Sequence, residues 1–285
     1  MSQFSSSPMQ PLSVGNVVTA GLRIYRSHFK SYFLLAVKAY LWVLVPVYGW
    51  AKLFAIAGLL SRLAFSELVN QPESIEASSR FVNSRLWQFL IAVVLMFLVG
   101  LGIGIGFIVL IGIISAIFTA LSAVGNLAVS GIAALIAIVV TLAFTIGILW
   151  LLARFFIVEV PLAIEDDINA TSTISRSWEL TKGFAWRLLG ISLVAYLIAL
   201  PIQIAVQVGS SIIQIILASL SSQDPLGSSL LLSTLNTLIS ILILGLILLS
   251  GALILPFWQA IKAVVYYDLR TRREGLGLKL RDRNI

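Results

Sequence analysis

Residues 86–153 read LWQFLIAVVLMFLVGLGIGIGFIVLIGIISAIFTALSAVGNLAVSGIAALIAIVVTLAFTIGILWLLA, and they contain no Asp, Glu, Lys or Arg. A helix needs about 20 apolar residues to cross a bilayer core roughly 30 Å thick, so this stretch holds two crossings and a turn. The Gly125-Asn126 pair is a turn signal. It divides the predicted transmembrane hairpin 88–155 into spans at 88–119 and 127–155.

A second charge-poor stretch lies between Arg187 and Lys262, where Asp224 is the only charged residue. Its Ser, Gln, Asp, Pro and Gly residues between 221 and 227 predict a loop. The stretch therefore predicts a second hairpin over 187–256, with spans at 187–219 and 229–256. Pro256 is expected to kink the last helix before it leaves as a basic cytoplasmic tail, 257–285.

The composition places all 285 residues in one membrane domain of the all-α class. Hydrophobic residues make up 59% of the chain and charged residues 11%, against roughly 45–50% and about 25% in soluble domains. The net charge of +7 does not indicate a nucleic-acid partner, because the basic residues flank apolar runs instead of forming one solvated face. The absence of cysteine excludes disulfides and thiolate metal sites, and the polar opening 1–13 is not a cleavable signal peptide.

The N-terminal part before the first hairpin is predicted in three pieces. Residues 12–30 mix apolar and basic side chains, which is typical of a helix lying in the membrane interface. The apolar run 31–65 would be about 50 Å long as a single helix, and residues 46–49, Pro-Val-Tyr-Gly, predict a break in it. A re-entrant or thin membrane hairpin fits this run, and the polar residues 66–87 form a cytoplasmic connection.

Residues 161–186 are expected to hold a second interfacial helix on the cytoplasmic side. Asp166 and Asp167 suit its N-terminus, and Gly183 suits its C-cap. Ile174 and Trp178 are four residues apart and would share its apolar face.

Lys and Arg residues predict the orientation, because they concentrate in cytoplasmic loops. Of the nineteen basic residues, only Lys38 and Lys52 fall outside the N-terminal segment, the segments 61–87 and 154–187 and the C-terminal end. Both termini are therefore expected in the cytoplasm, in a chain of the inner or plasma membrane. Because Lys30 and Arg62 are then both cytoplasmic, the chain between them must cross the membrane an even number of times. With the four long spans, the bundle has about six crossings, or four crossings and a re-entrant pair.

Three groups of residues are candidate sites. The first group lies in the 88–119 span, where glycines four residues apart let membrane helices approach closely. It comprises Gly100, Gly102, Gly104 and Gly106. A nucleotide-binding glycine loop would have to follow a strand, and that context does not exist here.

The second group is a pair of polar stripes on the last two spans. It comprises Gln203, Gln207, Gln214, Asn236, Thr237 and Ser240. If the stripes face one another, they either hydrogen-bond between helices or line a small hydrated path for a polar ligand. The first reading is favoured, and the second is the basis of a transporter or channel alternative.

The third group is the basic C-terminal end, whose charges can contact anionic lipid headgroups or anchor the topology. It comprises Arg270, Arg272, Arg273, Lys279, Arg281 and Arg283. No catalytic constellation stands out, because His28 is the only histidine and no pair of carboxylates is placed for acid and base work. No cofactor, metal or enzymatic activity is expected.

The segment Tyr266-Tyr267-Asp268-Leu269-Arg270-Thr271-Arg272-Arg273-Glu274-Gly275 resembles the end of a broad family of bacterial multi-pass proteins. This family is similar to the membrane domain sometimes fused to glycerophosphoryl diester phosphodiesterases, and residues 176–183, RSWELTKG, also fit its pattern. The resemblance implies a helical membrane domain and, weakly, an association with lipid metabolism or the envelope. The phosphodiesterase barrel itself has no counterpart here, so its activity does not follow.

The sequence thus favours a non-enzymatic membrane module that organises membrane lipids or protein partners, including other membrane proteins or further copies of itself. The alternative is a transporter or channel component with its polar path between the last two spans. An intramembrane enzyme has the weakest residue basis.

Overall fold

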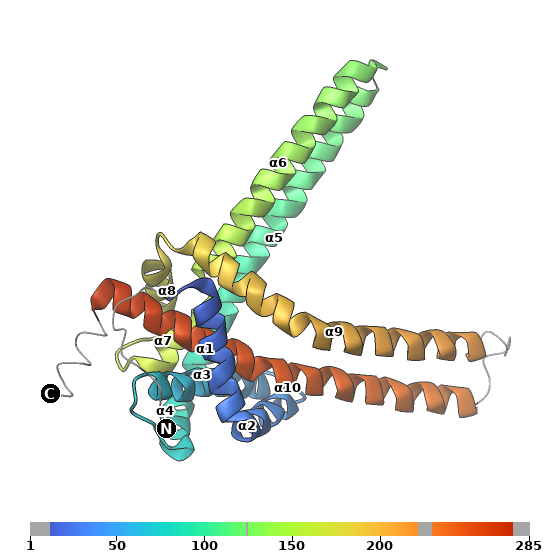
Figure 1. Ribbon diagram of the computed structural model, residues 1–285. Coiled ribbons are helices and arrows are strands. Elements are labelled where there is room, and N and C mark those ends of the chain that lie inside the picture. Colours follow the sequence, from blue (N-terminus) through green and yellow to red (C-terminus); the bar gives the residue numbers. More distant parts are fainter. Residues whose placement is uncertain (1–11, 124, 222–229, 276–285) are drawn as a thin grey trace. The chain divides into compact units, whose positions relative to one another are not determined.

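The computed structural model describes residues 12–123, 125–221 and 230–275, and within these ranges all regular secondary structure is α-helix (Figure 1). This confirms the predicted all-α class. The helices are α1 (Val14–Ser27), α2 (Phe29–Trp42), α3 (Tyr48–Leu68), α4 (Ile75–Ser84), α5 (Leu86–Ser122), α6 (Leu127–Arg154), α7 (Glu159–Ile164), α8 (Ser172–Thr181), α9 (Ala185–Ser221) and α10 (Leu230–Glu274).

Four helical stretches are long and apolar enough to cross a membrane. They are Leu86–Ser122, Leu127–Ile164, Ala185–Ser219 and Ser233–Glu274. They coincide with the four predicted long spans. The two further crossings expected in 31–65 find no support, because α2 has only 14 residues, or about 21 Å at 1.5 Å per residue, and α3 packs inside the protein.

The chain divides into two compact units, Met1–Leu86 together with Gly190–Ile285, and Trp87–Leu189. In the first unit the C-terminal half of α10 is the central element. Phe257, Ile261, Val264, Tyr266 and Leu269 are all at most 4% exposed. Their spacing of two to four residues puts them on a broad face that α1, α2 and α3 cover.

The stretch 257–274 is therefore not a separate tail. Pro256 lies inside α10, which continues to Glu274, and its apolar face is covered by this chain's own helices. The amphipathic pattern of this stretch predicts an apolar face that must be shielded from water. Lipid and protein can both shield such a face, so the pattern does not distinguish them. The rest of the predicted tail, 276–285, lies outside the described residues.

Helix α1 buries one face against α10. Ser13 caps its N-terminus by accepting a hydrogen bond from the Asn16 backbone N–H. Gly21 permits the close approach, because a Cβ there would lie 3.1 Å from the backbone of Ile261. The helix predicted at 12–30 thus exists with slightly shorter bounds, and its apolar face meets protein.

A turn after Trp42 separates α2 from α3, close to the break predicted at 46–49. Gly49 is required there, since a Cβ would come within 1.8 Å of the Trp42 carbonyl oxygen. Helix α3 then packs on α10, and the Ser61 hydroxyl donates to the Gln259 side-chain oxygen at 2.6 Å in a buried site. The apolar residues of α3 therefore build a protein core.

The connection 66–87 contains α4, whose N-terminus is capped by Ser74. Glu73 accepts two hydrogen bonds from Arg62 at 2.7 and 2.9 Å, and a third from Ser78. Burial alone would raise the pKa of Glu73, but these hydrogen bonds and the positive charge of Arg62 outweigh it and lower the pKa. The pair ties α4 to α3.

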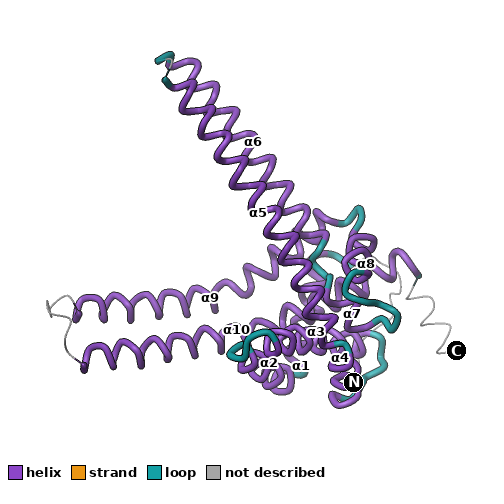
Figure 2. The backbone as a smooth tube through the Cα atoms, turned by 180° about the vertical axis from the view of Figure 1, so that it is seen from behind, coloured by secondary structure: helices purple, strands orange, loops and turns teal. Residues whose placement is uncertain are grey.

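In the second unit α5 and α6 run side by side as a hairpin (Figure 2). The turn falls where the sequence predicts it, with Gly125 at a φ of 71° and Asn126 accepting hydrogen bonds from the backbone N–H groups of Ala128 and Val129. Phe107 and Phe144 stack across the hairpin with ring centroids 5.6 Å apart.

The predicted segment 161–186 forms α7, α8 and the first turn of α9. Helix α8 begins at Ser172, later than expected, because the Asn169 side chain folds back to accept from the backbone N–H groups of Thr171 and Ser172. Its buried residues are Thr173, Ser177, Leu180 and Thr181. A mostly hydroxyl-bearing face is thus buried, rather than one centred on Ile174 and Trp178.

Candidate functional site

The outer surface of the helical hairpins is largely uncovered. In the most apolar window of each candidate span, the share of residues buried inside the protein is 0% for α5, 6% for the span that begins with α6, 17% for α9 and 11% for α10. A water-soluble protein rarely exposes so large a contiguous apolar area. These surfaces need an apolar environment or an apolar partner.

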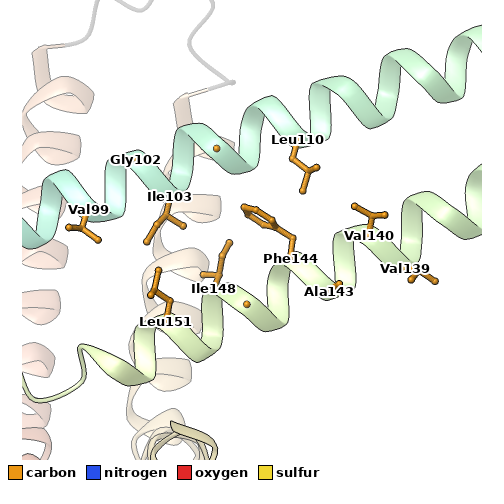
Figure 3. Close-up of a pocket in the computed structure, with 12 residues that line it drawn as sticks. Val99, Gly102, Ile103, Leu110, Val139, Val140, Ala143, Phe144, Ile148 and Leu151 are labelled. Carbon is orange, nitrogen blue, oxygen red and sulfur yellow. The ribbon is translucent and has the colours of Figure 1, made fainter. Parts of the chain in front are cut away.

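Between α5 and α6 this surface forms an open apolar groove of about 850 Å³ (Figure 3). Val99, Ile103 and Leu110 extend from α5 toward Phe144 and Ile148 on α6. The lining contains no ionisable or hydroxyl-bearing side chain. The groove can accept hydrocarbon, and it offers no group for acid, base or nucleophilic chemistry.

The predicted glycine series lies on this hairpin but does not bring two helices of this chain together. A Cβ added at Gly100, Gly102, Gly104 or Gly106 would meet no described atom within 4 Å. Gly102 and Gly106 instead open the groove, with Gly147 on α6. Close helix packing at these glycines therefore stays a prediction, and it requires a partner outside this chain.

Close packing at glycine occurs elsewhere, at positions that the sequence reading did not single out. A Cβ at Gly251 in α10 would lie 2.5 Å from Cζ of Tyr40 in α2, and Gly21 meets Ile261 as described. These glycines stand alone, without a partner four residues away, so a search for repeated small residues does not find them.

The structure places the polar-stripe side chains on exposed positions of α9 and α10. Gln203, Gln207, Gln214, Asn236, Thr237 and Ser240 are all exposed. The hydroxyls of Thr237 and Ser240 donate to carbonyls of their own helix, those of Ser233 and Asn236. The structure shows no enclosed polar path formed by these described residues.

The predicted headgroup contacts at the C-terminal end are partly engaged within α10. Arg270 pairs with Glu274 and Arg272 pairs with Asp268, each at 2.8 Å. Asp268 is buried and also accepts a hydrogen bond from the Leu12 backbone N–H at 3.3 Å. Arg273 is exposed, while Lys279, Arg281 and Arg283 lie outside the described residues.

The basic residues of α1 are more accessible. Arg23 and Arg26 are exposed, on the side of α1 away from its buried residues Val17, Val18 and Gly21. They are three residues apart, which places them on one face of the helix. This face offers positive charge next to the apolar spans of the same unit.

His28 follows α1 and lies against a carboxylate. Its Nδ1 is 3.0 Å from the Glu67 side chain. Burial raises the pKa of Glu67, and the nearby His28 acts in the opposite direction. The Ser27 hydroxyl oxygen lies 3.0 Å from the same Nδ1, so both groups share one ring nitrogen, whereas a Ser-His-acid triad has one partner on each nitrogen. The described residues contain no cluster of three or more His, Cys, Asp or Glu that could hold a metal.

Arg154 is a buried residue that the sequence reading treated only as the end of a span. It is 2% exposed, and its guanidinium carbon lies 4.1 Å from the centre of the Trp178 ring and 5.6 Å from that of Trp150. Its carbonyl accepts hydrogen bonds from Ser177 and Thr181. Trp150 and Arg154 are four residues apart, and that spacing was the available signal for a cation held on an aromatic face.

A family model described as "Protein of unknown function (DUF975)" matches residues 53–273. The chain belongs to this family. The match runs from the second turn of α3 to the end of α10, so it includes both hairpins and the core around α3 and α10. No curated protein and no solved structure matches the chain. The DUF975 match carries no link to glycerophosphoryl diester phosphodiesterases, and that resemblance stays an expectation.

Proposed function

We propose that this DUF975 protein is a non-enzymatic, multi-pass membrane module that organises lipid or protein partners around its two hairpins. The observation that carries the proposal is the uncovered apolar surface of the spans. In the most apolar part of each span, at most 17% of the residues are buried inside the protein. Acyl chains or other membrane helices must cover such a surface. The exposed cations of α1 add an attraction for anionic headgroups.

The proposed setting is the cell membrane, with both termini in the cytoplasm. The basic residues support this orientation, since the turns of both hairpins lack Lys and Arg while the opposite ends carry them. A transporter path is less well supported, because the amide and hydroxyl side chains of α9 and α10 are exposed rather than gathered around a cavity.

The test uses the purified full chain in bilayers made of equal amounts of phosphatidylglycerol and phosphatidylcholine. Discs cut from these bilayers with styrene–maleic acid copolymer are analysed for their lipid composition, and amine crosslinking reports self-association in the same sample. We expect phosphatidylglycerol to be enriched over the bulk membrane, or crosslinked oligomers to form. A charge-poor helical membrane protein of similar size is the control.

Two results would contradict the proposal. One is a disc with the bulk lipid composition that contains only uncrosslinked monomer. The other is hydrolysis of the lipids by the purified chain, or a solute flux through it, because a non-enzymatic organising module has neither activity.

A further inference from the structure

A second cavity lies inside the first unit, where α1, α9 and α10 meet. It has a volume of about 320 Å³, which is at the small end of the roughly 300–1,000 Å³ typical of ligand sites. We name it the α1 slot. The side chains that line it are apolar except for two, Tyr25 and Arg26.

Tyr25 is already engaged within the protein. Its hydroxyl donates to the Leu253 carbonyl at 2.8 Å, in the turn of α10 that Pro256 disturbs, since proline has no N–H to donate. Burial raises the pKa of Tyr25 to about 12, so the hydroxyl keeps its proton. Arg26 is exposed, and it is the cation that the slot presents to a ligand.

The position of the slot along the spans fits the membrane surface. A crossing takes about 20 residues, and counting from the loop ends of α9 and α10, Ser221 and Leu230, it ends near residues 201 and 250. The slot is lined by Ile198 and Ile202 of α9 and by Leu253 and Phe257 of α10. It therefore lies where the hydrocarbon core gives way to headgroups.

We propose that the α1 slot holds one acyl chain of an anionic phospholipid, with Arg26 binding the phosphate. The apolar lining suits a hydrocarbon chain, and a guanidinium forms charge-assisted hydrogen bonds with phosphate oxygens. A neutral apolar molecule would leave the cation unused, and a soluble anion would leave the apolar lining in contact with water. The inference rests on the proposed function, because it names the lipid class and one place where the module holds it.

The experiment measures binding of phosphatidylglycerol that carries a photoreactive diazirine on one acyl chain to the purified full chain in detergent. Crosslinked peptides locate the chain. We expect saturable labelling of residues that line the slot. Arg26→Gln should weaken phosphatidylglycerol binding roughly fivefold, the effect of one basic residue near an anionic surface, and should leave phosphatidylcholine binding unchanged.

Ile202→Trp fills the slot and should abolish the saturable labelling by both lipids. Two matched controls should bind as the wild type does: Arg80→Gln, which removes an exposed charge of α4 outside the slot, and Ile204→Trp, which places the same bulk at a 50% exposed position of α9 outside the slot. If Ile202→Trp does not fold, Leu22→Trp fills the slot from α1.

Equal weakening by Arg80→Gln and Arg26→Gln would overturn the slot, because it would show a diffuse attraction of the lipid to the positive charge of the protein. Labelling that persists in the filled variant would overturn it as well. If phosphatidylglycerol is still enriched in the discs, either result contradicts the proposed slot and leaves the proposed function standing. Wild-type discs that have the bulk lipid composition and contain only uncrosslinked monomer would contradict the proposed function as well.

Discussion

At the residue scale, single residues determine how closely α1, α2 and α3 pack against α10. Gly21 lets α1 lie against Ile261, Gly251 makes room for Tyr40, and Ser61 bonds to Gln259 inside the core. Each of these contacts joins residues far apart in the sequence. The α1 slot exists because Gly21 and Tyr25 hold α1 at this position on α10.

Gly21→Leu should therefore destabilise the protein. A side chain at this position has no space beside the Ile261 backbone, and overpacking of this kind costs about 1–3 kcal/mol. Gly15→Leu on the same helix is the control, since nothing lies within 4 Å of a Cβ there and leucine favours helix over glycine. Thermal unfolding in detergent measures both. A Gly21→Leu variant as stable as Gly15→Leu would show that α1 does not pack as described.

At the element scale, α8 shows how a polar helix can be fixed to the end of a membrane span. Its hydroxyl groups supply partners to the backbone carbonyls of Arg154, the last residue of α6, and of Val158, the N-cap of α7. Ser177 and Thr181 donate to the Arg154 carbonyl, at 2.9 and 3.1 Å, and Thr173 donates to the Val158 carbonyl. An apolar face would leave these carbonyls unsatisfied in a buried place.

Thr173→Val keeps the shape of the side chain and removes this donor. We expect a loss of about 1–3 kcal/mol, because the Val158 carbonyl becomes a buried acceptor without a hydroxyl partner. Ser175→Ala is the matched control, since Ser175 is exposed and its hydroxyl bonds within α8, to the Ser172 carbonyl. Chemical unfolding followed by tryptophan fluorescence reports the difference. Equal stability of the two variants would mean that α8 is not held by its hydroxyl face.

At the scale of the whole molecule, two charge-poor hairpins and several short polar helices divide the chain between two environments. The ends of the hairpins that lack Lys and Arg are expected outside the cell, and the helices with Lys and Arg are expected inside. The absence of cysteine makes this easy to test in intact cells.

Single cysteines at Leu127 and Ser219 should react with a membrane-impermeant thiol reagent in intact cells, and cysteines at Ala77 and Glu179 should react only after permeabilisation. All four positions are exposed in the structure, so an absent signal reports the membrane and not burial in the protein. Thr271 would be a poorer choice, because its hydroxyl is buried. Labelling of Ala77 in intact cells would invert the proposed orientation.

The structure confirms the all-α class and the four long apolar helices that the sequence predicts, but the candidate sites were only partly predictable. The glycine series and the polar stripes were chosen for their spacing, and both lie on surfaces that this chain leaves uncovered. Arg154 and the α1 slot were missed. The four-residue spacing of Trp150 and Arg154 was a signal for the cation on an aromatic face, but the contact of Arg154 with Trp178 of α8 was not predictable from it. The slot joins residues of α1, α2, α9 and α10, so it does not follow from local spacing.

The sequence by itself determined the four long apolar helices, because the lack of charge over such lengths excludes water as a solvent for them. It also determined the turn at Gly125 and Asn126, while the loop predicted at 221–227 lies almost wholly outside the described residues. Only the tertiary structure decided that α3 and the last turns of α10 pack on one another in a protein core. The physical reason is that an apolar face specifies how much surface must leave water, while lipid and a packed helix both satisfy that requirement. Which of the two covers a given face depends on contacts such as Gly21 with Ile261, and these form only when distant segments meet.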